Sequence, residues 1–381
     1  MNSLSVRGTF KGVTGYDQHT RNFVRELVSQ NISVQLMDFS NWSTQKLYRH
    51  HRDPFFDNLS HPVKSNIVLH FTMPHQVQIE KGRLNVNFTM FEANRIPQGW
   101  VEHNLNHDLV IVPTQSSKEA WISSGYPEER IRLCPLGVDV EKFTANVEPF
   151  PLKDKSGKLV SKYKTRVLNI SEVTPRKNLI GLLRTWIKST TKNDDAILIL
   201  KINCPWRRWL YKFYLDIKIM ERSLGKSLKN SAPVLFIVNE KFSSVDMLRL
   251  YSSATHYWSM SHGEGWDLCM MEAAAAGLDL IAPQHSAYTE YLDSTVADMI
   301  PSKTVPANFR WAYGLQKYFK NTDWWEPDEE TAEDYIKHIV TGSKRSNKVD
   351  IEKYSWRNAT KQLIEILSEL EPQKSINDSS Q

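Results

Sequence analysis

The sequence has 381 residues, which is long for a single hydrophobic core, so we expect two domains of ordinary size. A hydrophobic content of 40% with 24% charged residues is typical of a globular protein and excludes a disordered chain. The net charge of +5 suits a small anionic ligand or an anionic membrane surface, but it is too weakly basic to indicate nucleic-acid binding.

The cysteine and hydropathy patterns predict the cellular compartment of the protein. Cys134, Cys204 and Cys269 are widely spaced, odd in number and without a C-x-x-C pair, which favours a reducing compartment without disulfides. They also lack the spacing of metal ligands, so the sequence predicts no metal site. The first residues show no apolar core of signal-peptide length, and apolar runs of about five residues are too short to span a membrane. We therefore expect a cytoplasmic protein.

The first part of the chain alternates short apolar runs with amphipathic stretches. Residues 67–71, 86–91 and 109–113 each read as a buried strand, and residues 20–29 have a helical pattern with an apolar face. Strands and helices in alternation are typical of a parallel sheet covered by helices on both sides. The sequence therefore predicts an α/β domain over residues 1–150.

A second alternation begins after a pause. Residues 147–164 are rich in Lys, Pro and Gly and read as a linker. The pattern then predicts strands at 166–170, 196–201, 234–238 and 278–282, and a helix at 179–189. We therefore expect a second doubly wound domain over residues 160–345, facing the first across a cleft. Ligands of such sheets bind outside the carboxyl ends of the strands.

The most informative stretch is H-G-E-G-W-D-L-C-M-M-E at residues 262–272. Glu264 lies in a glycine-flanked turn before a strong helix-forming run that ends at Gly277. The helix N-terminus offers unpaired N–H groups and a partial positive charge, which suit a diphosphate. Glu272 lies about one turn into the helix, where a carboxylate can accept hydrogen bonds from ribose hydroxyls. A surface acid followed by an ordinary helix glutamate is the simpler interpretation.

Two further motifs border predicted helices. Arg176 and Lys177 follow the strand at 166–170, where fixed cations stabilise the charge that develops on a departing nucleoside diphosphate. Gly12 and Gly15 precede the first helix, where glycine lets the backbone approach a ligand closely. Taken alone, each motif also fits a solvated basic loop or a plain turn. The first strand is not followed by G-x-G-x-x-G, which argues against a dehydrogenase.

Five motifs in this order resemble the retaining glycosyltransferases of family four, which have the GT-B fold. They are the glycine loop at 12–16, P-T-Q-S at 113–116 with R-L-C-P-L-G-V-D-V-E-K-F at 132–143, R-K-N at 176–178, Leu248, Tyr251 and Ala254 with residues 261–277, and Y-S-W at 354–356. The resemblance covers nearly the whole chain. It implies two Rossmann-like domains, with an acceptor in the first and a nucleotide-sugar donor in the second. It also implies retention of anomeric configuration, no metal and no other cofactor.

The resemblance also implies roles for individual residues. Glu264 would bind hydroxyls of the donor sugar, and Glu272 would bind the ribose. Arg176 and Lys177 would bind the diphosphate, and Gly15 would approach the phosphate or the acceptor. The other donor-site candidates flank these positions or lie at a strand end near the base: Gly265, Trp266, Leu268, Cys269, Val238 and Asn239.

Three positions depart from the family pattern. Ser171 and Glu172 stand where the family usually has Gly-Arg at a strand exit, and that arginine binds phosphate. Asp267 stands where the family often has glycine, and we expect it to cap the helix. Residues 90–94 replace a stretch with a histidine near the reacting sugar, which makes Glu92 the candidate for stabilising positive charge there.

Two stretches near or beyond the second domain have their own composition. Residues 205–229 interleave aromatic and basic side chains, which suits a membrane interface. A solvated helix with its aromatic residues packed inward is the simpler interpretation. The resemblance implies a C-terminal helix at about 353–370 that crosses back to the first domain, and the polar residues 371–381 are expected to be disordered.

The sequence therefore predicts a retaining glycosyltransferase that moves a sugar from a nucleotide-diphosphate sugar to a glycan or lipid-linked acceptor, in cell-surface polysaccharide synthesis. Peripheral membrane contact through 205–229 is one option within this prediction. The alternative, motivated by Ser171 and Glu172, is a non-catalytic nucleotide-sugar or glycan-binding relative of the same fold. The missing signal peptide argues against a periplasmic sugar receptor, and a nucleotide-sugar epimerase is a distant alternative.

Overall fold

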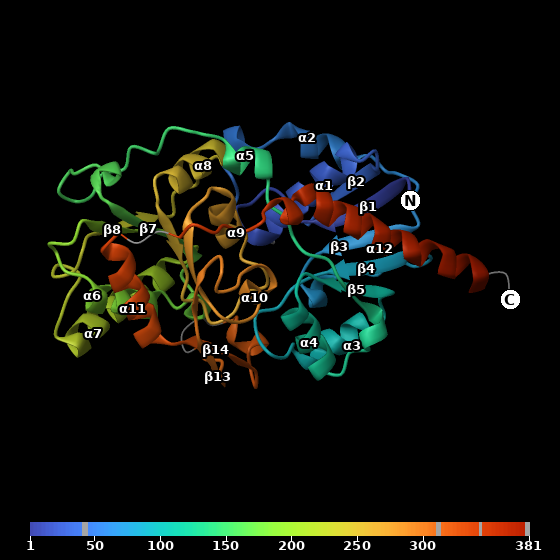
Figure 1. Cartoon of the computed structure of the whole chain (residues 1–381). Coiled ribbons are helices and arrows are strands. Elements are labelled where there is room, and N and C mark those ends of the chain that lie inside the picture. Colours follow the sequence, from blue (N-terminus) through green and yellow to red (C-terminus); the bar gives the residue numbers. More distant parts are fainter. Residues whose placement is uncertain (40–44, 310–313, 343–344, 378–381) are drawn as a thin grey trace. The chain divides into compact units, whose positions relative to one another are not determined.

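The computed structural model describes residues 1–39, 45–309, 314–342 and 345–377, with only the backbone for 371–377. The chain forms two compact units, which are Met1–Val138 with Glu352–Gln381, and Asp139–Ile351 (Figure 1). The second unit is thus inserted between two parts of the first. Its boundary lies at Val138 rather than near residue 150.

The stretch expected to be a linker is packed onto the second unit. The backbone N–H of Phe150 donates to the Arg249 carbonyl at 3.1 Å, and the Phe150 ring stacks on Phe242 with centroids 5.2 Å apart. Val160 is fully buried. The surrounding residues are mostly Lys, Gly and Ser, so the composition of this stretch predicted a linker. Phe150 and Val160 nevertheless hold it on the second unit.

The first unit is one parallel sheet with helices packed on it. Its elements are β1 (Ser3–Gly8), α1 (Gly15–Ser29), β2 (Ser33–Asp38), α2 (Pro54–Asp57), β3 (Ile67–Phe71), β4 (Leu84–Phe88), α3 (Gln98–Asn104), β5 (Leu109–Val112), α4 (Gln115–Ser123), β6 (Ile131–Leu133) and α12 (Trp356–Asn377). The strand order among the described residues is β2-β1-β3-β4-β5-β6. Strands β3 and β4 are buried along their whole length, as in parallel sheets covered on both faces.

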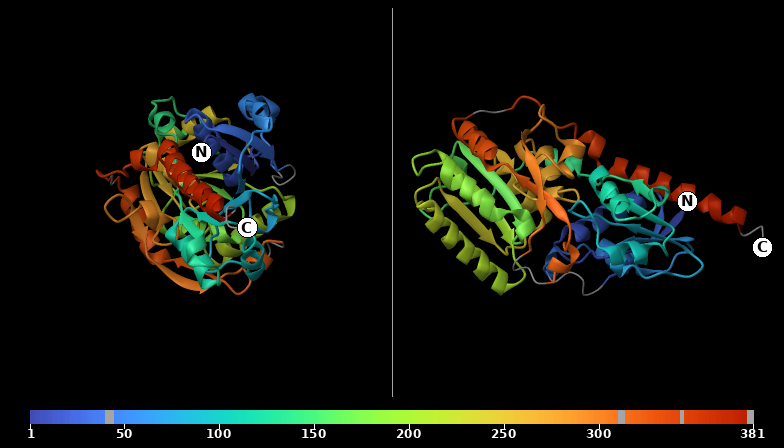
Figure 2. Two further views of the ribbon diagram at one scale, coloured as in Figure 1. Left: turned by 90° about the vertical axis from the view of Figure 1, so that its right-hand side faces the viewer. Right: turned by 90° about the horizontal axis from the view of Figure 1, so that it is seen from below.

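The C-terminal helix α12 packs against α1 of the first unit (Figures 1 and 2). At its start, the Val138 N–H donates to the Tyr354 carbonyl at 2.8 Å, and the Trp356 N–H donates to the Val138 carbonyl at 3.2 Å. Gly137 leaves no room for a side chain, since a Cβ there would lie 2.5 Å from the Trp356 Cα. The helix continues to Asn377, past the expected end near residue 370, and residues 378–381 lie outside the described part.

The second unit is also built on a parallel sheet. Its elements are α5 (Val140–Thr144), β7 (Thr165–Glu172), α6 (Leu179–Ser189), β8 (Ala196–Asn203), α7 (Arg207–Leu224), β9 (Val234–Val238), α8 (Ser244–Ser252), β10 (His256–Trp258), α9 (Leu268–Ala275), β11 (Asp279–Pro283), α10 (Tyr288–Tyr291), β12 (Asp298–Ile300), β13 (Ser302–Pro306), β14 (Asp323–Pro327) and α11 (Glu329–Val340). The main strand order among the described residues is β12-β11-β10-β7-β8-β9, and β13 and β14 form an antiparallel pair.

Helices α6, α7 and α11 cover one face of the second sheet (Figure 1). Leu198, Leu200 and Ile202 of β8 point into the core on this face, together with Trp186 of α6 and Phe213 of α7. Side chains alternate across a strand, so Lys201 points to the opposite face. Among the described residues, no helix combines the length and hydropathy needed to cross a membrane.

The strand order of the second sheet reverses between β7 and β10. Strands β8 and β9 lie on one side of β7, and β10 to β12 lie on the other. The loops that follow β7 and β10 therefore leave the sheet side by side in opposite directions. Such a switch point at the carboxyl ends of parallel strands is where ligands bind in doubly wound sheets. Arg176 and Lys177 lie in the first of these loops, and Glu264 lies in the second.

Candidate functional site

The loops after β7 and β10 are joined by backbone hydrogen bonds. Residues Pro175–Lys177 form a short 3₁₀ turn, and Asn178 follows with a left-handed φ of 48° and caps α6 through the Gly181 N–H. The His262 N–H donates to the Arg176 carbonyl at 2.8 Å. This contact fixes the basic turn against the residues that precede Glu264.

Glu264 pairs with both predicted cations. Its Oε2 lies 2.9 Å from the Arg176 guanidinium, and its Oε1 lies 2.6 Å from Lys177 Nζ. The Glu264 residue is only 5% exposed. Burial raises the pKa of this carboxyl, but the charges of Arg176 and Lys177 outweigh that effect and lower the pKa to about 2. We call these three residues the Glu264 triad, and its carboxylate is ionised at neutral pH.

Asp267 caps helix α9, as the sequence predicted. Its side chain accepts a hydrogen bond from the Met270 N–H at 3.3 Å and another from the Tyr288 hydroxyl at 2.8 Å. The backbone at Asp267 has a left-handed φ of 61°, a conformation that glycine adopts freely and aspartate tolerates. Burial and the nearby Glu264 charge raise the pKa of Asp267. An anionic ligand at this helix end would therefore bind best when Asp267 is protonated.

Glu272 is oriented by a tyrosine from the neighbouring helix. The Tyr251 hydroxyl donates to Glu272 Oε2 at 2.7 Å, and Tyr251 itself is fully buried. Burial raises the pKa of Glu272 to about 7, although the Tyr251 hydrogen bond favours the charged form. The half-buried Glu272 carboxyl therefore changes its charge near neutral pH.

The remaining motif residues divide into buried and accessible ones. Gly265 is buried, and Trp266 is 2% exposed with its carbonyl accepting the Tyr291 hydroxyl at 2.9 Å. The Trp266 ring therefore belongs to the core and is not a platform for a ligand. Leu268 and Cys269 are half-buried in the first turn of α9.

Val238 and Asn239 lie at the carboxyl end of β9. Val238 is the last residue of the strand and is half-buried. Asn239 follows with a left-handed φ of 59°, and its side-chain oxygen accepts the Cys204 N–H at 2.7 Å. Asn239 thus ties the ends of β8 and β9 together at the same sheet edge as the Glu264 triad.

Lys201 is a candidate that our sequence reasoning missed. It lies near the carboxyl end of β8, is 5% exposed, and places Nζ 5.2 Å from the Phe242 ring centroid. Within the described part of the chain, its ammonium forms no ion pair at contact distance. Burial lowers the pKa of Lys201, whereas the nearby Cys269 and Glu240 raise it. A lysine inside the run A-I-L-I-L-K-I-N was the signal, because buried charges normally have a partner or a function.

Ser171 and Glu172 belong to the strand and not to a loop at its exit. They are the last two residues of β7 and pair with Ile202 and Asn203 of β8. The Ser171 hydroxyl donates to the Asn169 side chain at 2.7 Å, and Glu172 is exposed. The positive charge at this switch point therefore comes from Arg176 and Lys177, one turn later in the chain.

Gly15 and Glu92 belong to the first unit. Gly15 is the first residue of α1, and a Cβ there would meet nothing within 4 Å. The Gly12 N–H donates to Asp17 at 2.7 Å, which holds the glycine loop on α1. Glu92 is half-buried after β4, and its charge contributes to raising the pKa of the buried Tyr16. Glu92 and the start of α1 therefore lie on the same side of the first sheet.

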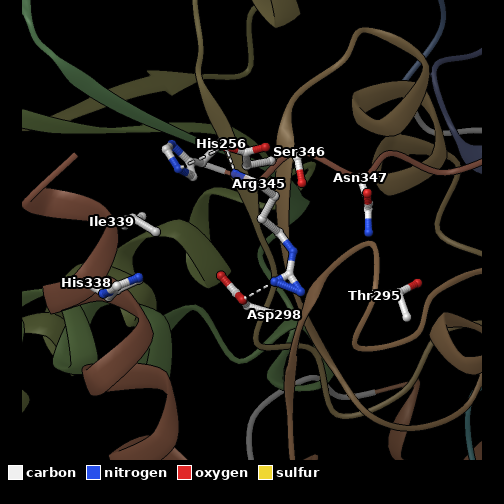
Figure 3. A pocket seen from close by; sticks show the side chains of 9 residues that line it. His256, Thr295, Asp298, His338, Ile339, Arg345, Ser346 and Asn347 are labelled. Atoms are coloured by element: carbon white, nitrogen blue, oxygen red, sulfur yellow. Dashed lines mark hydrogen bonds and ion pairs between the residues drawn. The ribbon is translucent and has the colours of Figure 1, made fainter. Parts of the chain in front are cut away.

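A polar cavity of about 300 Å³ lies at the amino ends of strands in the second sheet (Figure 3). His256, Asp279 and Asp298 line it and are the first residues of β10, β11 and β12. Arg345 pairs with Asp298 at 2.8 Å inside it. The cavity thus lies at the amino ends of the strands, away from the Glu264 triad. Among the described residues, no cluster of His, Cys, Asp and Glu could hold a metal ion.

Solved structures with this fold include known glycosyltransferases. HepE from Anabaena, in complex with UDP, has a TM-score of 0.62 at 13% identity, covering 97% of this chain and 100% of its own. A glycosyltransferase from Rickettsia africae has a TM-score of 0.59 at 13% identity, covering 97% of this chain and 98% of its own. Sucrose-phosphate synthase from Thermosynechococcus elongatus has a TM-score of 0.58 at 12% identity, covering 97% of this chain and 99% of its own. The chain has the GT-B fold.

The GT-B fold confirms the predicted class, with two Rossmann-like units built on parallel sheets. No protein-family model matches the sequence, and no curated protein matches it either. At 12–13% identity the neighbours show the fold alone.

Proposed function

We propose that this protein is a retaining, metal-independent glycosyltransferase of the cytoplasm. Its donor would be a nucleotide-diphosphate sugar, and its acceptor a glycan or lipid-linked molecule of cell-surface polysaccharide synthesis. The observation that carries the proposal is the Glu264 triad, which lies at the switch point just before α9 and has a buried carboxylate. The neighbouring HepE has been solved with UDP and with UDP-glucose, which supports a nucleotide-sugar donor.

The charges at this edge suit a diphosphate leaving group. Arg176, Lys177 and Lys201 provide three cations, of which Glu264 balances one charge. During transfer, the bond from the anomeric carbon to the diphosphate oxygen breaks while the bond to the acceptor oxygen forms, and the acceptor hydroxyl proton passes to the departing diphosphate. Negative charge then grows on the diphosphate, and cations already fixed in place stabilise it without reorganisation. The first turn of α9, at Leu268 and Cys269, adds backbone N–H groups to this environment.

The other polar groups have roles in orienting the donor. Glu264 would accept hydrogen bonds from sugar hydroxyls while it holds its two cations. Glu272, oriented by Tyr251, would accept hydrogen bonds from the ribose. The end of β9 at Val238 and Asn239 would face the base. On the acceptor side, Gly15 and Glu92 of the first unit are the proposed contacts.

A donor panel tests the proposal. Thermal shift with UDP-, GDP-, ADP- and dTDP-sugars should identify a stabilising donor, and that donor should support transfer to a lipid-linked or glycan acceptor. Lys177→Met should lower turnover at least 100-fold, since a cation aimed at the charge that develops on the diphosphate contributes that much. Glu264→Gln should also lower turnover, because it removes the carboxylate that holds Arg176 and Lys177 in place and is proposed to bind the sugar hydroxyls. Lys188→Met is the matched control, because Lys188 forms an exposed ion pair with Glu333 in the same unit. Unchanged turnover in both site variants would show that the assigned site is wrong.

Lys201 has a separate test within the same assay. Loss of a charge-assisted hydrogen bond should weaken donor binding by about 10- to 100-fold in Lys201→Met, and Lys201→Arg should retain most of it. Calorimetry with the nucleoside diphosphate measures this directly. Equal dissociation constants for the wild type and Lys201→Met would remove Lys201 from the donor site.

A non-catalytic nucleotide-sugar or glycan-binding protein is the second candidate. It is favoured by the pairing of both Arg176 and Lys177 with Glu264 and by the missing cation at Ser171 and Glu172. Calorimetry that shows donor binding, together with no transfer to a broad acceptor array and no donor hydrolysis, would select this candidate over the enzyme.

A further inference from the structure

Helix α7 lies on the outside of the second unit (Figure 1), and the exposure of its side chains shows a second apolar face. Five large hydrophobic side chains protrude from the helix and its cap: Trp206 (52% exposed), Tyr211 (71%), Tyr214 (42%), Leu215 (42%) and Ile219 (52%). Together they make up five of the nine large hydrophobic residues that are exposed in the described part of the chain. Such a concentration of apolar side chains in water marks an interaction surface.

This outer face is not left over from the packing of the core. The opposite side of α7 is buried through Phe213, Ile217 and Met220, which pack in the core of the second unit. The helix is therefore already anchored by one apolar stripe before the outer stripe is considered. The simpler expectation from sequence was a helix with its aromatic residues packed inward. Phe213 fits this expectation, but the exposed Tyr211 and Tyr214 do not.

The outer face is also strongly basic. Residues 205–229 contain seven Lys and Arg against two acids, a net charge of +5 that equals the net charge of the whole chain. Arg207, Lys218 and Arg222 are exposed among the protruding apolar side chains. The acids Asp216 and Glu221 are half-buried and paired with Lys212 and Lys218, so negative charge on this face is neutralised locally.

We propose that the outer face of α7 docks on an anionic lipid surface, with the helix lying parallel to the membrane. Tyr and Trp rings place an apolar body among acyl chains and a polar tip among headgroups, and Lys and Arg reach anionic headgroups from the same depth. The 18-residue helix extends about 27 Å along the surface. Each cation near such a surface strengthens binding on the order of fivefold.

The docking proposal does not depend on the proposed transfer reaction. It concerns one helix of the second unit, and vesicle binding is measured without a donor or an acceptor. Helix α7 begins directly after the carboxyl end of β8, the edge that carries Lys201 and the Glu264 triad. A membrane under α7 would therefore lie close to the edge where the donor is proposed to bind.

Vesicle sedimentation tests the docking of α7. The full chain is mixed with vesicles of phosphatidylcholine alone, or of phosphatidylcholine with 30% phosphatidylglycerol, at low and at physiological salt. We expect binding to the anionic vesicles, weakened by salt, and at least tenfold weaker binding to the neutral ones. Tyr211→Ser/Ile219→Ser should lose at least tenfold in affinity, and Arg207→Glu/Arg222→Glu should lose at least tenfold together with the salt dependence.

Matched controls separate docking from non-specific effects. Lys155→Glu/Lys192→Glu changes the net charge equally on exposed positions away from α7, and Val245→Ser removes an exposed apolar side chain of α8. Both controls should bind like the wild type, and circular dichroism should show that every variant is folded. Wild type that does not bind anionic vesicles, or α7 variants that bind like the controls, would overturn the proposal. Equally tight binding to heparin or RNA, lost in the same variants, would reassign the face to an acidic macromolecule.

Discussion

Glutamine at position 264 removes the carboxylate that pairs with both Arg176 and Lys177. The two cations hold the pKa of Glu264 at about 2 against an ordinary 4.5, which corresponds to about 3 kcal/mol in favour of the charged carboxylate. Removal of one partner from a buried ion pair typically lowers the free energy of unfolding by about 3–5 kcal/mol, because the remaining charge stays buried without compensation. The two figures are of similar size. We therefore expect Glu264→Gln to lower the free energy of unfolding by about 3 kcal/mol at pH 7.

Urea unfolding followed by tryptophan fluorescence measures this loss. With a denaturant slope of about 3 kcal/mol/M, the midpoint should fall by about 1 M. Lys177→Met should cost a similar amount, and the double variant should cost clearly less than the sum of the two. Asp195→Asn is the control, since Asp195 is the exposed partner of Lys158 and should cost less than about 1 kcal/mol.

At acid pH, the difference in the free energy of unfolding between the wild type and Glu264→Gln should become smaller. Because the folded-state pKa of Glu264 is depressed, its stabilisation is complete above the unfolded-state pKa and is lost as the pH falls towards about 2. The difference in unfolding free energy should therefore fall to less than half near pH 3. A difference that does not change with pH, or additive single-variant effects, would refute the view that the three charges form one coupled unit around a buried carboxylate.

Three further substitutions probe other sites. Glu272→Gln should match the wild type in stability near pH 4 and exceed it by about 2 kcal/mol at pH 8, because the raised pKa of Glu272 makes its ionisation costly in the folded state as the pH rises through about 7; parallel urea titrations at both pH values check this, and a constant difference contradicts it. Gly137→Ala should destabilise the first unit by more than about 2 kcal/mol, because its Cβ would lie 2.5 Å from the Trp356 backbone; hydrogen exchange in α12 that matches the wild type would contradict this. Gly15→Ala should leave stability unchanged, because its Cβ meets no atom within 4 Å, yet it should weaken binding of the acceptor or phosphate; an unchanged binding isotherm would remove Gly15 from the site.

Periodicity and motif spacing predicted the scaffold well. The helix at 179–189 and the strand at 234–238 have the predicted bounds, because the apolar residues of each element contrast with the polar turns around it. The placement of Glu264 before a helix and of Glu272 on it was also correct, since glycine and a run of alanine define that helix locally. Asp267 was correctly predicted as its cap.

The partnerships inside the site could not be predicted from local pattern. Arg176 and Lys177 were expected to bind a phosphate, and in the structure they pair with Glu264. Lys177 and Glu264 are 87 residues apart, and the strand order of the second sheet brings them together. Lys201 escaped notice because a strand pattern specifies which positions are buried but not which buried charge is left without a partner. Trp266 was assigned to the ligand, but its ring packs against Tyr291 of α10, a contact that the local pattern around residue 266 does not predict.

The insertion of the second unit into the first has a consequence for synthesis on the ribosome. Residues 139–351 emerge as one continuous segment and carry all of the second sheet, so this unit can complete its core while the end of the chain is still being translated. The first unit emerges earlier but waits for α12, the helix that packs on α1 and whose first turn lies against Gly137. The first unit therefore begins to emerge before the second but completes its fold after it. Until α12 has been made, the surface of α1 that packs against it is accessible to chaperones.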